Sequence, residues 1–195
     1  MEGTPTWDAV VLAGGRARRL GGVDKAALVV AGRSLLELAL TACAGARHRV
    51  VVGPRRDTGA PVQWVRESPA GSGPLAALGA GLAELPSGSD VVVVLAADLP
   101  AVDTNIVGRL LATVIGSPEA DVAVVVDDER RAQPLLAAYR RDRLERALGE
   151  LGDLGDRSLR ELLARLAVAE VVDLAAAQDI DTPADLARWA GDRTP

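Results

Sequence analysis

The residues with the clearest chemical potential lie at positions 10–25, which read VVLAGGRARRLGGVDK. An apolar run typical of a buried parallel strand opens this stretch; two glycine pairs, three arginines and Asp24-Lys25 follow. Glycine lets backbone N–H groups approach a ligand without a Cβ in the way, and arginine and lysine add fixed positive charge beside those donors. The pattern predicts a cradle for a polyphosphate. A glycine-containing turn with solvated arginines is the alternative.

Lys25 is distinguished by composition. Of the 22 basic residues in the chain, every one except Lys25 is an arginine. A compact ammonium suits different contacts from a planar guanidinium. The one lysine, which lies in the glycine loop, therefore favours a contact with phosphate. The loop is neither a Walker A loop nor a dinucleotide fingerprint, because G-K-[ST] and G-x-G-x-x-G are both missing after the first predicted strand.

Carboxylates follow two other predicted strands. The apolar run Val91–Ala96 leads to Asp98, and ligands of open α/β sheets bind outside the carboxyl ends of strands. Asp98 would then face the polyphosphate across a cation, for which Mg²⁺ is expected. A cap on the following turn is the alternative role. Asp179 and Asp181, after the last predicted strand, are either helix caps or a second acid near the metal.

Other motifs carry weaker signals. The loop ESPAGSGPL, from Glu67, leads into a small-residue helix whose first amides could face a ligand, although a surface loop is the alternative. Gln133-Pro134-Leu135 could line a second substrate pocket or be structural. His48, the one histidine, lies between two arginines and is expected at the surface, which disfavours His-dependent catalysis and two-His zinc sites. The segment 140–146 reads as a solvated helix face with local ion pairs.

Composition sets the broader limits. With 195 residues, 49% hydrophobic and 25% charged, the chain is expected to form one folded domain, residues 1–195. A net charge of −5 argues against a general nucleic-acid binder. The single cysteine, Cys43, excludes an intrachain disulfide and is expected to be a buried small residue. No signal-peptide core and no apolar run near the roughly 20 residues of a membrane span are present, so we expect a cytoplasmic protein.

Apolar runs alternate with helical patterns, which predicts an α/β fold with a mainly parallel sheet. Strands are expected near Asp8–Ala13, Arg49–Gly53, Val62–Val65, Val91–Ala96, Asp121–Val126, Gln133–Ala138 and Val168–Val172. Helices are expected over Ser34–Gly45, Pro74–Leu85, Thr104–Ile115, Asp142–Leu151, Ser158–Leu166 and Pro183–Ala190.

These stretches together resemble the molybdenum cofactor guanylyltransferases, within the glycosyltransferase-A-like nucleotidyltransferases. LAGGRARRLGGVDK is similar to the family's L-A-G-G-x-x-x-R-M-G-G-x-D-K, with Leu20 in place of Met. GSGPLAAL resembles a G-P-L-A-G segment with Ala77 in place of Gly, and ADLP around Asp98 resembles C-D-M-P. The segment 179–183 resembles N-x-N-T-P, with acids in place of both Asn. The matches extend from about residue 12 to residue 186.

The resemblance implies a three-layer Rossmann-like nucleotidyltransferase fold with one antiparallel strand in the sheet. It also implies transfer of GMP from GTP to the terminal phosphate of molybdopterin, with Mg²⁺ as cofactor. Transient contact with molybdoenzymes or cofactor-assembly proteins is the protein partnership that this activity would involve, with neither nucleic acid nor membrane as a partner.

Site residues are carried over by position. Leu12, Ala13 and Gly14 would meet the base and nucleotide through the backbone, with Gly14 and Gly15 as donors. By the same carry-over Lys25 would contact the phosphates; the chemistry of phosphoryl transfer, rather than the resemblance, assigns Arg19 to the β- and γ-phosphates and Lys25 to the charge developing around the α-phosphate. Gly53 stands where the family often has an Asn near the guanine, and Glu67 where it usually has Asp. Asp98 would bind Mg²⁺, with Asp181 as a second acid on the metal side.

Three rival interpretations remain open at the level of sequence. The acceptor could be a sugar 1-phosphate or another small phosphate, or the nucleotide could be CTP, although the G-G-x-D-K pattern favours guanylyl transfer. The third is a nucleotide-binding accessory protein without turnover, which the presence of both Lys25 and Asp98 disfavours.

Overall fold

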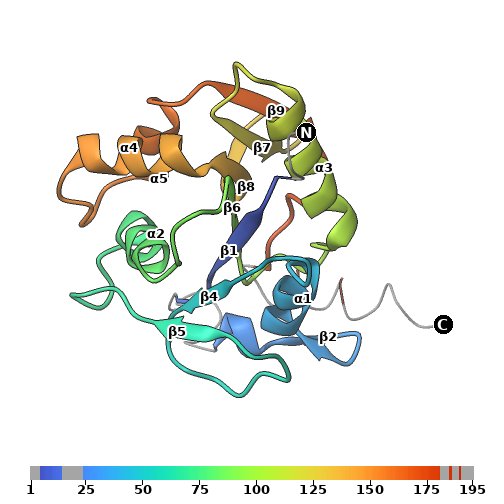
Figure 1. Cartoon of the computed structure of the whole chain (residues 1–195). Coiled ribbons are helices and arrows are strands. Elements are labelled where there is room, and N and C mark those ends of the chain that lie inside the picture. Colours follow the sequence, from blue (N-terminus) through green and yellow to red (C-terminus); the bar gives the residue numbers. More distant parts are fainter. Residues whose placement is uncertain (1–4, 15–23, 181–184, 186–188, 190–195) are drawn as a thin grey trace.

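A seven-stranded mixed sheet forms the middle of the molecule (Figure 1). The computed structural model describes residues 5–14, 24–180, 185 and 189. The strands of this sheet are β1 (Trp7–Leu12), β4 (Arg49–Val52), β5 (Gln63–Val65), β6 (Val91–Ala96), β7 (Val122–Val126), β8 (Ala132–Arg140) and β9 (Val168–Val172). All seven expected strands are confirmed, with boundaries that differ by at most a few residues.

The strands lie in the order β5-β4-β1-β6-β8-β7-β9. Each neighbouring pair is parallel except that β8 runs antiparallel to both β6 and β7. The expectation of one antiparallel strand is therefore confirmed. The carboxyl ends of β1, β4, β5 and β6 all point to the same edge of the sheet, where ligands of open α/β sheets bind.

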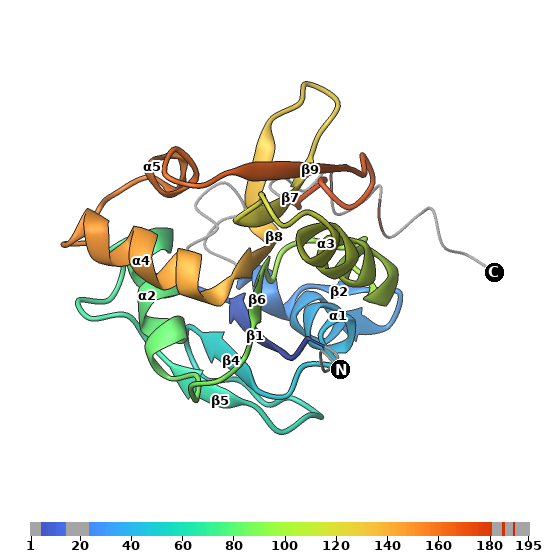
Figure 2. The same ribbon diagram turned by 45° about the horizontal axis from the view of Figure 1, so that its top comes forward.

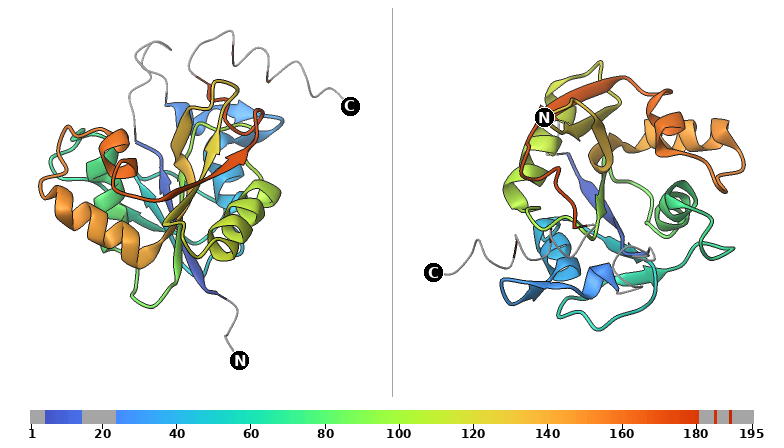
Figure 3. Two further views of the ribbon diagram at one scale, coloured as in Figure 1. Left: turned by 90° about the horizontal axis from the view of Figure 1, so that it is seen from above. Right: turned by 180° about the vertical axis from the view of Figure 1, so that it is seen from behind.

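Helices cover both faces of the sheet, as Figures 1 and 3 show from the front, from above and from behind. Alternate residues of β1 divide between the two faces: Ala9 and Val11 pack with α1 (Leu35–Ala42) and α3 (Thr104–Gly116), whereas Val10 and Leu12 pack with the other helices. Those on the second face are α2 (Pro74–Ala83), α4 (Arg141–Leu151) and α5 (Leu159–Leu163).

Local sequence explains where several helices begin. Ser34 and Glu37 form a capping box at the start of α1, and Ser158 and Glu161 form one at the start of α5. Pro74 occupies the first turn of α2. Helices α1 and α5 are shorter than expected. The predicted helix 183–190 falls largely outside the described residues.

Two small elements between β1 and α1 were not expected. The single helical turn η2 (Lys25–Ala27) is followed by a hairpin of two-residue strands, β2 (Val29–Val30) and β3 (Arg33–Ser34). Ala31 and Gly32 join these strands with φ of 51° and 80°, the left-handed geometry that a two-residue hairpin turn needs.

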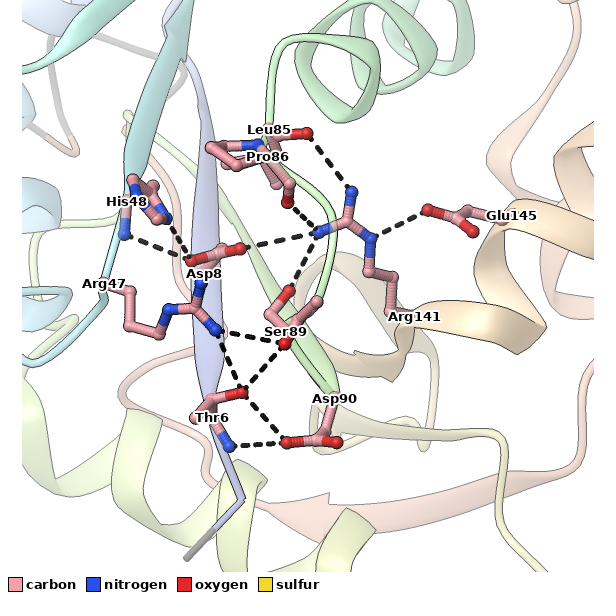
Figure 4. A network of polar contacts seen from close by, with 11 residues as sticks. Thr6, Asp8, Arg47, His48, Leu85, Pro86, Ser89, Asp90, Arg141 and Glu145 are labelled. Carbon is pink, nitrogen blue, oxygen red and sulfur yellow. Dashed lines mark hydrogen bonds and ion pairs between the residues drawn. The ribbon is translucent and has the colours of Figure 1, made fainter.

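The amino end of the sheet contains a buried polar network, seen in Figure 4. Asp8 of β1 is fully buried, and its Oδ1 accepts hydrogen bonds from the backbone N–H of His48 at 3.2 Å and from its imidazole Nδ1 at 3.0 Å. Asp8 Oδ2 lies 3.5 Å from Arg141 Nη1, an ion pair without a hydrogen bond. The His48 side chain is partly exposed, as expected, and lies at the edge of this buried network.

Arg141 corrects the expectation that residues 140–146 form a solvated helix face. Its side chain is buried, and it donates to the carbonyl oxygens of Pro86 and Leu85, to Ser89 Oγ and to Glu145. The expected local ion pair to Glu145 is present, but Arg141 faces inward because it offsets the buried charge of Asp8.

Cys43 is buried, as expected, and burial raises the pKa of its thiol to about 12. Within the described part of the chain, no helix is both long and apolar enough to span a membrane.

Candidate active site

A cleft of about 910 Å³ opens at the carboxyl edge of β1, β4, β5 and β6. Every predicted site residue that the structure describes lines it: Leu12, Ala13, Gly14, Lys25, Gly53, Glu67 and Asp98. The structure thus brings these residues together, while their chemical roles stay predictions. Gly15, Arg19 and Asp181 lie outside the described residues.

The cleft floor is made by the ends of three adjacent strands. Beyond β1, the amide of Ala13 donates to the Val52 carbonyl at 2.8 Å, and the amide of Ala97 donates to the Leu12 carbonyl at 3.0 Å. These bonds continue the sheet past its regular strands, so the glycine loop and the Asp98 turn start side by side.

Lys25 and Asp98 meet in this cleft although 73 residues separate them. Lys25 Nζ donates to Asp98 Oδ2 at 3.2 Å, and the two side chains are 19% and 25% exposed. The pair is accessible enough for a ligand to reach it. The ammonium of Lys25 and the carboxylate of Asp98 neutralise each other's charge in the cleft.

Gly53 closes the wall of the cleft beside the end of β1. Its φ is +147°, and a Cβ would lie 2.8 Å from the Ala13 carbonyl carbon and oxygen and 2.9 Å from the Gly14 nitrogen. No side chain fits there without a backbone shift, so this wall consists of backbone. That geometry accounts for glycine at a position where the resembling family often has Asn.

Glu67 lines the cleft, but its carboxylate accepts a hydrogen bond from the Gly71 amide at 2.8 Å. It therefore braces the loop that leads to α2. Among the residues that the structure describes, no side chain caps the first amides of α2, and Gly73 and Pro74 at its start also line the cleft. The expected helix N-terminus is thus directed at the site.

The opposite wall contains Gln133, Pro134 and Leu135, the segment expected to line a second substrate pocket. The Tyr139 hydroxyl donates to the Pro134 carbonyl at 2.7 Å and holds this wall in place. Asp179 also lines the cleft, and the Ile180 amide donates to the Asp98 carbonyl at 3.2 Å. The segment before Asp181 therefore lies against the Asp98 turn.

Sequence reasoning missed two arginines around the cleft, Arg56 and Arg66. Arg56 forms a bidentate ion pair with Asp24, and Asp24 lines the cleft. The hydrogen bond from Arg56 is the main cause of the lowered pKa of the Asp24 carboxyl. Arg66 lines the cleft and makes no hydrogen bond or ion pair with the described residues. No pattern in the sequence marks Arg56 as the partner of Asp24; Arg66 lies at the end of a predicted strand, which is a usable signal.

The residues present are compatible with Mg²⁺ that arrives with a substrate. Among the described residues, no group of three or more His, Cys, Asp or Glu could hold a metal by itself. Mg²⁺ typically takes one or two carboxylates together with substrate phosphates and waters. Asp98 supplies such a carboxylate at the cleft, and Asp179 lines the same cleft.

A cleft at the carboxyl edge of a mostly parallel α/β sheet agrees with comparisons to known proteins. Residues 9–171 match the model of the MobA-like NTP transferase domain. The chain belongs to this family of nucleotidyltransferases.

The chain is also similar to curated proteins over part of its length. A molybdenum cofactor guanylyltransferase from Shewanella amazonensis is 31% identical over 127 residues, which span 63% of this chain and 63% of that relative. The match therefore spans less than two thirds of the relative's length.

Solved structures share the fold over almost the whole chain. Molybdopterin-guanine dinucleotide biosynthesis protein A from Archaeoglobus fulgidus is 26% identical, with a TM-score of 0.69, covering 94% of this chain and 96% of that one. The 2-C-methyl-D-erythritol 4-phosphate cytidylyltransferase from Thermus thermophilus also has a TM-score of 0.69, at 20% identity and 95% and 97% coverage. Because a molybdopterin-guanine dinucleotide biosynthesis protein and a cytidylyltransferase share this fold, the fold alone does not identify the base or the acceptor.

Proposed function

We propose that this protein transfers GMP from GTP to the terminal phosphate of molybdopterin and releases pyrophosphate. The observation that carries the proposal is the meeting of Lys25 and Asp98 in one cleft with the backbone of Leu12–Gly14. The similarity to guanylyltransferases supports GTP and molybdopterin as the substrates. Molybdoenzymes or cofactor-assembly proteins as transient partners follow from the same proposal.

In the proposed reaction, an oxygen of the acceptor phosphate forms a bond to the α-phosphorus of GTP. The bond from the α-phosphorus to the bridging oxygen breaks, and pyrophosphate leaves with that electron pair. Such transfers depend on positioning and on charge neutralisation rather than on a strong general base. This requirement suits a cleft whose described walls contain no histidine.

Each residue then has a defined task. Lys25 neutralises negative charge that develops around the α-phosphate, and the backbone of Ala13 and Gly14 holds the nucleotide against the wall made by Gly53. Asp98 would hold Mg²⁺, which would supply positive charge to offset that of the triphosphate and of the pyrophosphate. Lys25 contacts the substrate phosphate in place of its ion pair with Asp98. Arg19, Gly15 and Asp181 keep the roles expected from the sequence.

The test is pyrophosphate release with Mg²⁺, molybdopterin and each of the four nucleoside triphosphates in turn. We expect release with GTP alone, dependent on molybdopterin and lost in Asp98→Ala. Asp142→Ala, an exposed carboxylate remote from the cleft, is the matched control and should keep the parent rate. Release with CTP, or with a sugar 1-phosphate in place of molybdopterin, would replace the proposal by the corresponding alternative. GTP binding without release under all these conditions would indicate the accessory protein.

A further inference from the structure

Arg56 and Asp24 form a bidentate ion pair at the rim of the cleft. Arg56 Nε donates to Asp24 Oδ2 and Nη2 donates to Oδ1, both at 2.6 Å. The third nitrogen, Nη1, donates to the Pro54 carbonyl at 2.9 Å. All three guanidinium nitrogens are thus engaged, and the Arg56 side chain is only 16% exposed. Two parallel hydrogen bonds fix both the distance and the plane of the carboxylate.

This contact joins Asp24, which lines the cleft, to the loop after β4, whose residues Gly53 and Pro54 also line it. Arg56 lies in the loop between β4 and β5, a few residues after Gly53, whose backbone packs against Ala13 and Gly14. Asp24 lies at the end of the segment that follows β1. Arg56 therefore links Asp24 to a loop that packs against the cleft wall through Gly53.

Asp24 is also fixed from its other side. Its carbonyl accepts a hydrogen bond from the Ala27 amide at 3.1 Å, which starts the turn η2, and the buried side chain of Ala26 anchors that turn. Lys25 follows Asp24 directly. With Asp24 held on both sides, the direction in which the Lys25 side chain leaves the backbone is set, and it leads to Asp98.

We propose that Arg56 is a positioning residue for Lys25, holding its ammonium through Asp24 where the reacting phosphate binds. Arg56 does not itself line the cleft, whereas Asp24 and Lys25 do. It therefore acts through Asp24 and not by touching substrate. The role in turnover rests on the proposed function; the placement of Lys25 does not.

The first test needs no substrate and uses the fact that Lys25 is the one lysine of the chain. An amine-acylating reagent is applied to the full-length protein, and peptide mapping by mass spectrometry separates Lys25 from the N-terminal amine. In Arg56→Gln we expect Lys25 to be acylated several-fold faster than in the parent, because its ammonium leaves Asp98. Arg55→Gln is the matched control, since Arg55 is exposed in the same loop and has no ion pair among the described residues. An unchanged acylation rate in Arg56→Gln would overturn the proposal.

The second test is kinetic and separates positioning from direct binding. Misplacing a catalytic group by about 1 Å can cost up to ~10²-fold, so Arg56→Gln should lower kcat about tenfold with little change in the KM for GTP. In a Lys25→Met background the same substitution should have no further effect, because the group it positions is gone. A raised KM with unchanged kcat, or an equal loss in both backgrounds, would contradict positioning.

Failure of the proposed function and failure of the positioning role give different results. If the parent protein shows no turnover with GTP and molybdopterin, the proposed function fails, and the acylation rates still decide whether Arg56 places Lys25. If turnover is present and both Arg56 tests show no change, the positioning role fails alone. Thermal unfolding of Arg56→Gln and Arg55→Gln confirms that both variants are folded.

Discussion

Lys25 is the residue in which composition, position and contact coincide. Its ammonium lies 3.2 Å from Asp98 in a cleft built mainly from backbone and small side chains. A partly exposed pair of this kind contributes about 0–1 kcal/mol to stability, so its placement is better explained by chemistry than by folding.

We therefore predict that Lys25→Ala lowers kcat for pyrophosphate release by about 10²-fold, the scale of removing one electrostatic partner of a transition state. Lys25→Arg should not restore the rate, because a planar guanidinium cannot reproduce a compact ammonium. Steady-state kinetics with GTP would measure both variants. Near-parent activity in Lys25→Ala would remove Lys25 from the mechanism.

Gly53 gives a second prediction at the scale of one residue. In Gly53→Ala the new Cβ would lie 2.8 Å from backbone atoms of Ala13, at a φ that L side chains rarely adopt. We expect a loss of stability of about 1–3 kcal/mol, together with a raised KM for the nucleotide because the Ala13–Gly14 wall must move.

Chemical denaturation and steady-state kinetics test this prediction together. The control is Gly59→Ala, since Gly59 has open space around its Cβ position and should change neither quantity appreciably. A Gly53→Ala protein with the parent's stability and KM would show that the loop adjusts without cost.

At the scale of elements, the network around Asp8 joins helix α4 to strand β1 and to the segment between α2 and β6. Arg141 compensates a carboxylate that has no exposure to solvent, so Arg141→Met leaves the buried Asp8 with His48 as its remaining partner and without the guanidinium charge. Breaking a buried pair in this way costs about 3–5 kcal/mol. We predict a loss of this size in the free energy of unfolding, measured by urea denaturation.

Two comparisons show whether the burial of Asp8 is the cause. Arg146→Met on the exposed side of α4, whose contact with Glu150 is 3.9 Å long, should change stability by less than about 0.5 kcal/mol. Adding Asp8→Asn to Arg141→Met should recover part of the loss, because the buried charge is removed. No recovery would assign the loss to the hydrogen bonds from Arg141 to Pro86, Leu85 and Ser89 instead.

The same elements show what the sequence could and could not predict. The central strands β1, β4, β6 and β7 were predictable because they are mostly buried apolar runs, and most cleft residues because they lie at or just after the carboxyl ends of strands. The hairpin β2–β3 was missed because two-residue strands leave no periodicity. Arg141 and Arg56 were missed for another reason: on their own segments they resemble any surface arginine, and their partners Asp8 and Asp24 are distant in sequence.

At the scale of the whole molecule, the fold separates stability from chemistry along the strands. The buried network of Asp8 lies at the amino end of β1, and the cleft lies at the opposite, carboxyl end; Figure 2 shows the sheet with its helices from a second direction. Substitutions in the network should therefore change stability and leave the KM of the folded protein near that of the parent.

The pH dependence of stability is a property of the whole chain, and its two limbs have different causes. Hydrogen bonds from backbone amides, Thr, Ser or Arg lower the pKa of five carboxyls below their ordinary values of 3.8 for Asp and 4.5 for Glu: Asp24, Glu37, Asp90, Asp127 and Glu161. The folded state then binds fewer protons than the unfolded state. Their contribution is complete above the ordinary pKa values and is lost as the pH falls through and below them.

Burial has the opposite effect on two weak acids. It raises the pKa of Cys43 from 9.0 to about 12 and raises the pKa of Tyr139 above its ordinary value of 10.0. The folded state keeps these protons, so the contribution is complete below pH 9.0 and is lost as the pH rises toward 12. We therefore predict a plateau of stability between about pH 5 and pH 8, with a decline on each side.

Salt separates the two limbs, because the lowered carboxyls are mostly exposed while Cys43 and Tyr139 are buried. Urea midpoints measured across the pH range should show a loss of stability at acid pH whose size changes with salt. Salt screens exposed charges, with a Debye length of about 8–10 Å at ordinary ionic strength. The alkaline limb comes from desolvation, so it should persist in high salt and become shallower in Cys43→Ala. If high salt instead abolished the alkaline limb, ionisation of surface groups and not of the buried thiol and phenol would be its cause.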